Sequence, residues 1–497
     1  MKKLFKFYLG RIISSGLFLA VQLFIIVGCC CYLCLHWHWV KIIADIIALI
    51  LALRIAVQKC NIPCRIGWII GVLFLPFLFI PMYLLYGRGS ALKKINHYLK
   101  DNPMPLNRAD TVVAPCEILK QFHGLNNVSS FPFYNGNAQY YATGEDFFEA
   151  MKYALSKAEK YIFLEFFIIN FGTMWEQTLE ILESKAKQGV SIYILYDDMG
   201  TIALLPPDFC KQMKDKGINA KIFNFFDGRI TAGINYRDHR KIVVVDGKIA
   251  LTGGANIADE YINLISPYGY WKDSAIKLTG NSVNTFSAMF IQMWNMSGHK
   301  LEYSDFLQYT ESSDRYDSIV LPFGDYPMCK LGFTERAFLN MINNAKREVY
   351  ITTPYLVLDS KLLSALCLAK ENGITVRIFT PEIPDKKYVH IVTRANYPTL
   401  LRGGVEIYEY SGFIHSKSIL CDDELAYVGS ANLDYRSLYI HFESGVLMYK
   451  TDSVAQLSKD FRNLFQVSKK ISPNDPKIIK ADKNIFYRFL RIFSGLL

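Results

Sequence analysis

The sequence predicts an α/β protein in which two similar domains, each a mixed β-sheet flanked by helices, follow N-terminal transmembrane helices. Three observations support this fold class. Long uncharged apolar runs occur only near the start of the chain, β-rich and helical stretches alternate further on, and the alternating pattern occurs twice. With 497 residues, the chain is long enough for two or three domains with separate cores. The predicted parts are a membrane anchor at 1–88, a linker at 89–114, a first domain at 115–310 and a second domain at 311–497.

The predicted anchor contains two uncharged runs, residues 12–35 and 66–86, that are long enough to cross a bilayer as helices. Aromatic side chains stand near the ends of the second run, as they do at membrane interfaces. The segment 40–57 between them carries three charged residues, and each charge at mid-bilayer costs about 2.5–3.5 kcal/mol. This segment is therefore either a third span or a helix that lies in the interface.

Charge and cysteine content limit the class of protein further. The net charge is +10, and Arg88, Lys93 and Lys94 directly follow the second apolar run. Such residues favour an anionic lipid surface and, by the positive-inside pattern, a cytoplasmic position for the two domains. Three spans would place these domains opposite the basic N-terminal tail, whereas two would leave both in the cytoplasm. The eleven cysteines form no even framework, so a disulfide-stapled secreted protein is not expected.

The two predicted domains repeat the same order of elements. A buried strand, an amphipathic helix closed by glycine and a second strand occupy 160–169, 175–189 and 190–198, and again 347–358, 361–373 and 374–381. Further strands at 216–226 and 403–410 each lead into a His-x-Lys segment. The repeated order indicates a duplication, with parallel-rich sheets covered by helices. Two such domains packed face to face would bring equivalent motifs together across a pseudo-twofold axis.

The repeated segments carry the pattern His-x-Lys-x4-Asp, followed by Gly-Gly-x-Asn or Gly-Ser-x-Asn. The residues are His239, Lys241 and Asp246 in the first copy, and His415, Lys417 and Asp422 in the second. Because strand side chains alternate between faces, each histidine and its lysine point the same way. Asp246 falls on the opposite face beside a turn, which favours a structural role.

The paired segments predict a phosphodiester site. Glycines 253 and 254 allow close backbone approach, and Asn256 supplies an amide, as Asn432 does in the second copy. Two lysines and two amides suit the non-bridging oxygens of a phosphodiester, while one imidazole attacks phosphorus and the other protonates the leaving alkoxide. This chemistry requires neither a metal nor a cofactor. Asp273 and Glu443 either hydrogen-bond the histidines and set their tautomer or are ordinary exposed carboxylates.

At these residues the sequence resembles the phospholipase D superfamily, and within it the bacterial cardiolipin synthases. The resemblance runs from about residue 60 to the C-terminus, and implies two phospholipase D-like domains about a pseudo-twofold axis. It also implies that His239 is the nucleophile, His415 the acid and base, Lys241 and Lys417 phosphate ligands, and that Asp246 and Asp422 complete the catalytic motif. The chain departs from the family at Cys421, where an aliphatic residue is usual, and this change is expected to be tolerated. Gly254 in the first copy stands where the second copy has Ser430, both beside the bound phosphate, which suggests that the half-sites differ.

The resemblance implies a multi-pass protein of the bacterial cell membrane, with its catalytic domains facing the cytoplasm. The implied reaction joins two phosphatidylglycerol molecules into cardiolipin and releases glycerol through a phosphatidyl-histidine. The substrate lies in an anionic bilayer, and no nucleic acid is involved. The C-terminal residues 484–497 form an amphipathic segment for the headgroup region or for core packing. The alternatives are a membrane-bound phospholipase D or a phosphatidyltransferase using another alcohol, a nuclease with the same motif, and a non-catalytic scaffold.

Overall fold

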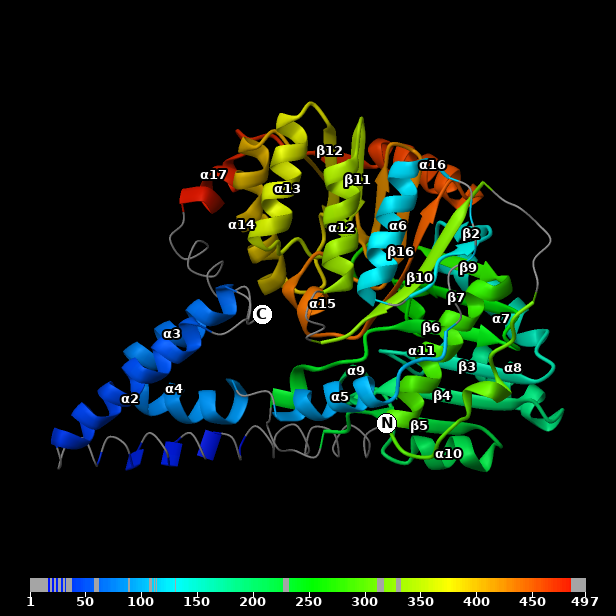
Figure 1. Cartoon of the computed structure of the whole chain (residues 1–497), viewed down its shortest axis with the longest axis horizontal. Helices are drawn as coiled ribbons and strands as arrows, with labels where there is room; N and C mark the ends of the chain where they lie inside the picture. The colour runs from blue at the N-terminus through cyan, green and yellow to red at the C-terminus, as the bar shows by residue number, and fades with distance from the viewer. Residues whose placement is uncertain are drawn as a thin grey trace. The chain divides into compact units, whose positions relative to one another are not determined.

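The computed structural model describes most of the chain after residue 37. The described ranges are 38–57, 62–87, 90–106, 110, 112, 114–129, 131–226, 232–310, 317–327 and 332–483, with isolated positions between 17 and 32. The chain divides into two compact units (Figure 1). One unit comprises Met1–His97, Phe226–Tyr236 and Asn484–Leu497, and the other comprises Tyr98–Phe225 and Arg237–Lys483. The predicted C-terminal amphipathic segment lies outside the described residues.

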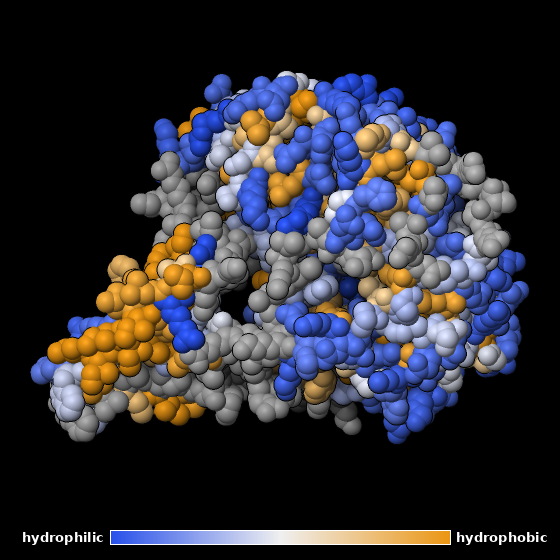
Figure 2. All heavy atoms as spheres, in the orientation of Figure 1, coloured by the Kyte–Doolittle hydropathy of each residue, from blue (hydrophilic) through white to orange (hydrophobic). Residues whose placement is uncertain are grey.

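The N-terminal unit is helical. Its elements are α2 (His38–Ala56), α3 (Ile62–Phe74), α4 (Pro76–Met82), the π-helical turn η1 (Tyr83–Gly87), the start of α5 (Ser90–Asp101) and the short 3-10 helix η2 (Ala232–Asn235). A small core of Ala48, Leu51, Ile55, Val72 and Tyr83 joins α2 to the later helices. The outer side of α2 is apolar and exposed (Figure 2), with Trp39, Ile42, Ile46, Leu49 and Leu53 all more than half uncovered.

The predicted membrane spans have different outcomes. The run 66–86 is not one helix, because Leu75 leaves the helical conformation and Pro76, which has no backbone N–H, begins a new helix. The segment 40–57 lies almost entirely in α2, while the run 12–35 falls outside the described residues apart from isolated positions. Among the described helices, none has the combination of length and apolar composition that a membrane crossing needs.

The first repeat forms a seven-stranded mixed sheet. Its order is β2 (Ala138–Tyr141), β9 (Ala275–Thr279), β7 (Ile249–Gly253), β6 (Lys241–Val245), β3 (Tyr161–Phe166), β4 (Ser191–Asp197) and β5 (Asn219–Phe223). Strands β3, β4 and β5 are parallel, and the other pairs are antiparallel. The sheet is accompanied by α7 (Gly144–Ser156), α8 (Thr173–Lys187), α9 (Asp198–Thr201), α10 (Phe209–Asp215) and α11 (Val283–Met296). The strands predicted at 160–169, 190–198 and 216–226 are confirmed as β3, β4 and β5.

The second repeat forms a nine-stranded mixed sheet with the same centre. Its order is β1 (Tyr134–Asn135), β10 (Ile319–Asp325), β17 (Glu443–Tyr449), β16 (Leu425–Gly429), β15 (Ser418–Cys421), β11 (Glu348–Thr352), β12 (Thr375–Pro381), β13 (Glu406–Tyr410) and β18 (Ser468–Lys470). Its helices are α6 (Cys116–Ser129), α12 (Phe333–Asn344), α13 (Ser360–Glu371), α14 (Lys387–Arg402), α15 (Tyr435–Tyr439), α16 (Asp452–Gln466) and α17 (Pro476–Lys483). Figure 1 shows α6, α12 and α13 side by side over its strands. Strands β11, β12 and β13 are parallel, like their counterparts β3, β4 and β5.

The start of the predicted first domain belongs to the second sheet. Strand β1 pairs with β10, and α6 packs on α12, with Glu117 bound to Lys346 at 2.7 Å. The first sheet therefore begins at β2, not at residue 115. A pattern of alternating elements predicts strands and helices, but it does not say which of two similar sheets an edge strand joins.

The two sheets meet at equivalent points of the repeat. Strand β8 (Trp271–Lys272) of the first repeat pairs with β14 (Phe413–Ile414) of the second, and Asp238 forms a parallel bridge with Phe442. Strands β7 and β9 also contact β16 and β17. The segments that carry His239 and His415 thus each run beside the opposite repeat, which is the face-to-face arrangement that the duplication predicts.

Candidate active site

His239 is held by residues of the second repeat. Its backbone N–H donates to the Phe442 carbonyl at 2.9 Å. Its ring Nδ1 lies 3.0 and 3.1 Å from the two carboxylate oxygens of Glu443, the first residue of β17. Because the backbone and the ring are both bound, the imidazole is fixed between the repeats.

His415 repeats this arrangement in the opposite direction. Its backbone N–H donates to the Lys272 carbonyl at 2.7 Å, and its Nδ1 lies 2.7 Å from Asp273 Oδ2. Each imidazole is therefore bound by the carboxylate that comes directly after its backbone partner in the other repeat. Asp273 and Glu443 are 0% and 1% exposed, so the alternative of exposed carboxylates is wrong.

Both imidazoles are neutral near pH 7. Burial lowers the pKa of His239 well below its usual 6.5, and the nearby lysine charges lower it further. Burial and Lys417 lower the pKa of His415 to about 4. A neutral ring that faces a carboxylate carries its proton on the facing nitrogen, so Nδ1–H donates and Nε2 keeps its lone pair. The pKa of Asp273 is lowered because the hydrogen bond and charge of His415 outweigh the effect of burial.

The two lysines of the motifs are almost fully buried beside the histidines. Lys241 Nζ donates to the His239 carbonyl at 2.5 Å, and Lys417 Nζ donates to the His415 carbonyl. Burial lowers the pKa of Lys241 to about 8 and that of Lys417 to about 7. A bound anion would oppose this effect, since it favours the charged ammonium groups.

The two half-sites share one electrostatic environment. After burial, the groups that lower the pKa of His239 are Lys241, Lys417, His415 and Lys386. Two of these belong to the second motif, and the crossed contacts of His239 with Glu443 and of His415 with Asp273 bring the two motifs to the same interface. The structure therefore brings together both histidines, both lysines and both carboxylates of the predicted site.

Asp246 and Asp422 do not belong to this group, which corrects their assignment as catalytic residues. Asp246 follows β6 at the end remote from Lys241, and its carboxylate accepts the backbone N–H groups of residues 159, 160 and 161 at 2.7–2.8 Å. Asp422 does the same for residues 346, 347 and 348 at 2.7–2.9 Å. Both have a left-handed backbone, with φ of 53° and 57°. They secure the start of β3 and β11, as the face alternation of Asp246 indicated.

The two asparagines are only partly available to a ligand. Asn256 Oδ1 accepts the Ile168 N–H at 3.0 Å, and its Nδ2 donates to the Tyr261 hydroxyl at 2.7 Å. One amide N–H is left for a phosphate. Asn432 Oδ1 is buried without a hydrogen-bond partner. Asn256 thus supports the Ile168 backbone and the Tyr261 side chain near the histidines.

Comparison with known proteins identifies the family. The family described as "Cardiolipin synthase, PLD-like domain" matches residues 151–294 and 338–465. Cardiolipin synthase 2 of Staphylococcus epidermidis is 31% identical over 87% of this chain and 91% of its own length. The chain belongs to the cardiolipin synthase family. It is therefore an enzyme of the phosphatidyltransferase class.

Two further proteins are similar to this chain. An uncharacterized protein of Streptococcus mutans is 40% identical over 75% of this chain and 81% of its own length. The crystal structure of a phosphatidylserine synthase from Haemophilus influenzae has a TM-score of 0.60 at 15% identity, and covers 76% of this chain and all of that one. This likeness shows a shared fold, and the matching family model describes that fold as phospholipase D-like, as the sequence predicted.

The two half-sites of this cardiolipin synthase family member differ beside their carboxylates. Ser430 Oγ donates to Glu443 Oε2 at 2.5 Å. The equivalent Gly254 has no side chain, and a Cβ there would overlap Asp273 Oδ1. Gly254 is required for space, because Asp273 occupies the volume that the serine fills in the other half.

We expect Gly254→Ser to lower turnover by more than about 10²-fold, because the new side chain displaces Asp273 from His415. Ser430→Gly removes one hydrogen bond to Glu443 without a clash and should cost about tenfold or less. Gly124→Ser is the matched control, because nothing lies within 4 Å of that position. Initial rates of phosphatidyl transfer check this order, and a fully active Gly254→Ser variant would contradict the steric argument.

His441, which the sequence motifs did not indicate, lies beside His239. Its ring lies 5.5 Å from that of His239, its Nε2 accepts from Arg436 Nε at 3.2 Å, and its Nδ1 lies 3.7 Å from Glu443 Oε1. In the other half Trp271 takes this place, 5.1 Å from the His415 ring. His441 stands two residues before Glu443, as Trp271 stands two residues before Asp273, and this shared spacing could have predicted its position.

Within the described residues, His239, His441 and Glu443 form one group whose ligand atoms lie within 4.8 Å of one another. The donor set fits a cation poorly. His239 Nδ1 and Glu443 are hydrogen-bonded to each other, and Ser430 also binds Glu443. The charges of Lys241 and Lys417 act on the same imidazole and disfavour a cation there.

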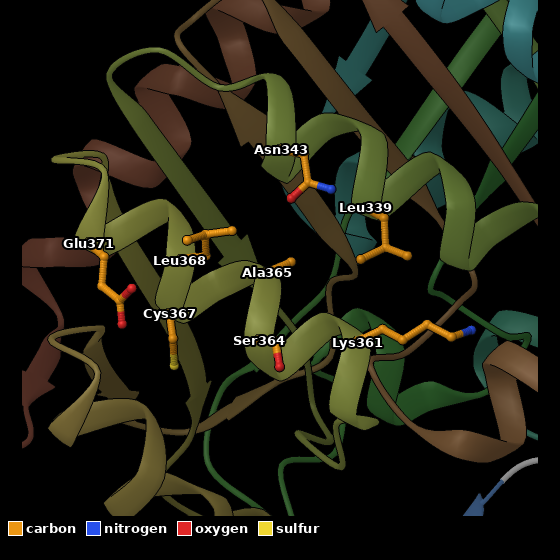
Figure 3. Close-up of a pocket in the computed structure, with 8 residues that line it drawn as sticks. All are labelled: Leu339, Asn343, Lys361, Ser364, Ala365, Cys367, Leu368 and Glu371. Carbon is orange, nitrogen blue, oxygen red and sulfur yellow. The ribbon is translucent and has the colours of Figure 1, made fainter.

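A surface pocket on α12 and α13 lies apart from this chemistry (Figure 3). Its lining includes Leu339, Asn343, Lys361 and Glu371, and no residue of the predicted site. This pocket therefore gives no support for a second site for the predicted chemistry.

Proposed function

We propose that the chain is a cardiolipin synthase, which transfers a phosphatidyl group from one phosphatidylglycerol to another and releases glycerol. The observation that carries the proposal is the crossed pair of imidazole and carboxylate groups, His239 with Glu443 and His415 with Asp273. It supports two histidines that act on one phosphorus atom from the two repeats. The names of the relatives supply the substrate, since several are cardiolipin synthases.

In the first step, His239 Nε2 attacks phosphorus and the bond from phosphorus to the glycerol oxygen breaks. His415 gives its Nε2 proton to that oxygen, which leaves as glycerol. In the second step, His415 takes a proton from a hydroxyl group of a second phosphatidylglycerol. The resulting oxygen nucleophile attacks phosphorus, and the phosphorus–nitrogen bond breaks. The products are cardiolipin and an unmodified His239.

The acid role of His415 requires a proton that its low pKa does not favour in the free protein. A bound phosphodiester supplies the condition for protonation, because its negative charge opposes the lysine charge that lowers this pKa. Lys241 and Lys417 would hold the non-bridging oxygens throughout. Their ammonium groups are most effective in a site that excludes water.

A transferase also needs an alcohol that competes with water. A site held at a bilayer meets its lipid acceptor at high local concentration. The basic residues and apolar runs before residue 97, and the exposed apolar side of α2, support such anchoring at the inner face of a bacterial cell membrane. The alternative function is a membrane-bound phospholipase D or a transferase that uses another alcohol.

Incubation of the full-length protein with vesicles of phosphatidylglycerol alone tests the proposal. Cardiolipin and glycerol in equal amounts are expected. Phosphatidic acid as the sole lipid product would instead establish a phospholipase. Cleavage of DNA with the lipids left intact would establish a nuclease.

Anion binding should weaken as the pH rises through about 7 to 8, where Lys417 and Lys241 lose their protons. Below these pKa values both lysines are cations that attract an anion, and above them both are neutral and do not. Sulfate suits the measurement because its charge is constant over this range. Its inhibition constant should rise at least about tenfold between pH 6.5 and pH 9.5, and a constant value would contradict the assignment of the lysines.

A further inference from the structure

The loop between β12 and α14 places an unsatisfied carboxylate next to this site. Asp385 Oδ2 accepts a hydrogen bond from the Tyr355 hydroxyl at 2.5 Å. Its other oxygen, Oδ1, is buried and has no hydrogen-bond partner. A buried acceptor without a donor is unfavourable, and a hydroxyl group of a ligand would satisfy it.

Asp385 lies at the end of the second sheet that carries the second motif. Its partner Tyr355 follows β11, whose Thr352 pairs with Ser418 directly after Lys417, and Leu356 bridges Leu433 directly after Asn432. Burial raises the pKa of Tyr261, whose ring is 5.4 Å from the His415 ring, and the charge of Asp385 raises it further. Burial lowers the pKa of Lys417, and Asp385 is one of the carboxylates that oppose this shift. The neighbouring Lys386 lies 5.4 Å from the centre of the Tyr355 ring, and its charge acts on His239. The charges of this loop thus act on groups of both half-sites, Asp385 on Lys417 and Lys386 on His239.

The donor phosphate and the acceptor alcohol need different partners in a transfer reaction. The non-bridging oxygens of the phosphodiester carry negative charge, which a carboxylate would repel, so Asp385 is unsuited to bind phosphate. The acceptor alcohol carries hydroxyl donors, and the proposed reaction brings it to His415. A second hydroxyl beside the reacting one has a matching acceptor in Asp385 Oδ1.

We propose that Asp385 Oδ1 accepts a hydrogen bond from a second hydroxyl of the acceptor alcohol, so that the site selects a vicinal diol, such as a glycerol head group. This inference rests on the proposed transfer reaction and names a specificity residue for it. Water and alcohols with one hydroxyl leave Oδ1 unsatisfied in the bound state. The ammonium group of an aminoalcohol would also pair with Asp385, but it would add a cation beside the buried Lys241 and Lys417, which favours the neutral diol.

The test compares 1,2-propanediol with 1-propanol, which differ by one hydroxyl. The full-length protein is supplied with phosphatidylglycerol vesicles and equal concentrations of both alcohols, and the two phosphatidyl alcohols are measured by mass spectrometry. The wild-type protein should prefer the diol. Asp385→Ala should lower the diol-to-propanol product ratio by about tenfold or more, whatever the change in both rates. A purely structural role would reduce both products equally.

Two further variants keep the test decisive if Asp385→Ala folds poorly. Asp385→Asn retains an acceptor oxygen and should keep part of the preference for the diol. Tyr355→Phe removes the hydrogen bond that orients the Asp385 carboxylate and should lower the diol-to-propanol ratio. Glu382→Gln, an exposed carboxylate of the same loop, is the matched control. An unchanged ratio in Asp385→Ala would overturn the inference alone, as would a wild-type preference for ethanolamine over the diol. A wild-type protein that transfers phosphatidyl groups to no alcohol would overturn the proposed function as well.

Discussion

Replacing His239 or His415 with alanine is expected to abolish cardiolipin formation, with a loss of at least about 10⁴-fold for each variant. Both imidazoles are buried and bound through Nδ1 to a carboxylate of the other repeat. The neighbouring His441 is engaged by Arg436 through its Nε2, so it does not replace His239. The double variant should be about as slow as either single variant. Cardiolipin is measured after incubation with phosphatidylglycerol vesicles. His123→Ala is the control, because His123 is exposed and packs on Phe133.

A substrate with an activated leaving group separates the two roles. Phosphatidyl p-nitrophenol needs no proton on its leaving oxygen, so His415→Ala should still release one burst of p-nitrophenol and retain a phosphatidyl-histidine. His239→Ala should release none. A burst from His239→Ala and none from His415→Ala would reverse the assignment, and full turnover by either variant would refute the paired mechanism.

The second large effect is expected from the carboxylates. Asp273→Asn and Glu443→Gln should each lower turnover by about 10²–10⁴-fold, because an amide N–H in place of the carboxylate favours the opposite tautomer of the imidazole. The protein should remain folded, since the shape of each side chain is unchanged. Asp273→Asn acts on His415 and should slow the step that consumes the intermediate as well as the first step. Glu443→Gln acts on His239 and should slow formation of the intermediate.

Single-turnover rates and far-UV circular dichroism together check this prediction. Glu424→Gln is the matched control, because that carboxylate is half exposed and pairs with Lys450 at the surface. Near-normal rates in both amide variants would mean that the carboxylates only fill space. A loss of folded structure in these variants would instead mean that the two carboxylates are needed for folding.

Much of the fold follows from local patterns. The alternation of buried strands with amphipathic helices predicted β3, β4 and β5 and their counterparts β11, β12 and β13, because each pattern reflects one element and the face it buries. The position of β1 and α6 in the second sheet was not predictable, because edge pairing depends on which sheet presents a free strand. Pro76 could have predicted the break in the helix at Leu75, but the length of the run and its lack of charge favoured a single membrane span.

The sequence by itself determined the candidate reacting groups of this protein: two copies of a histidine and lysine pair, spaced so that both side chains of a pair share a strand face. Only the tertiary structure decided the partners. The hydrogen bonds of His239 to Glu443 and of His415 to Asp273 join residues 204 and 142 positions apart. Asp246 and Asp422, by contrast, bind backbone N–H groups at strand ends remote from the histidines. Spacing along a strand fixes which way a side chain points, but the packing of one sheet on another decides which groups it contacts.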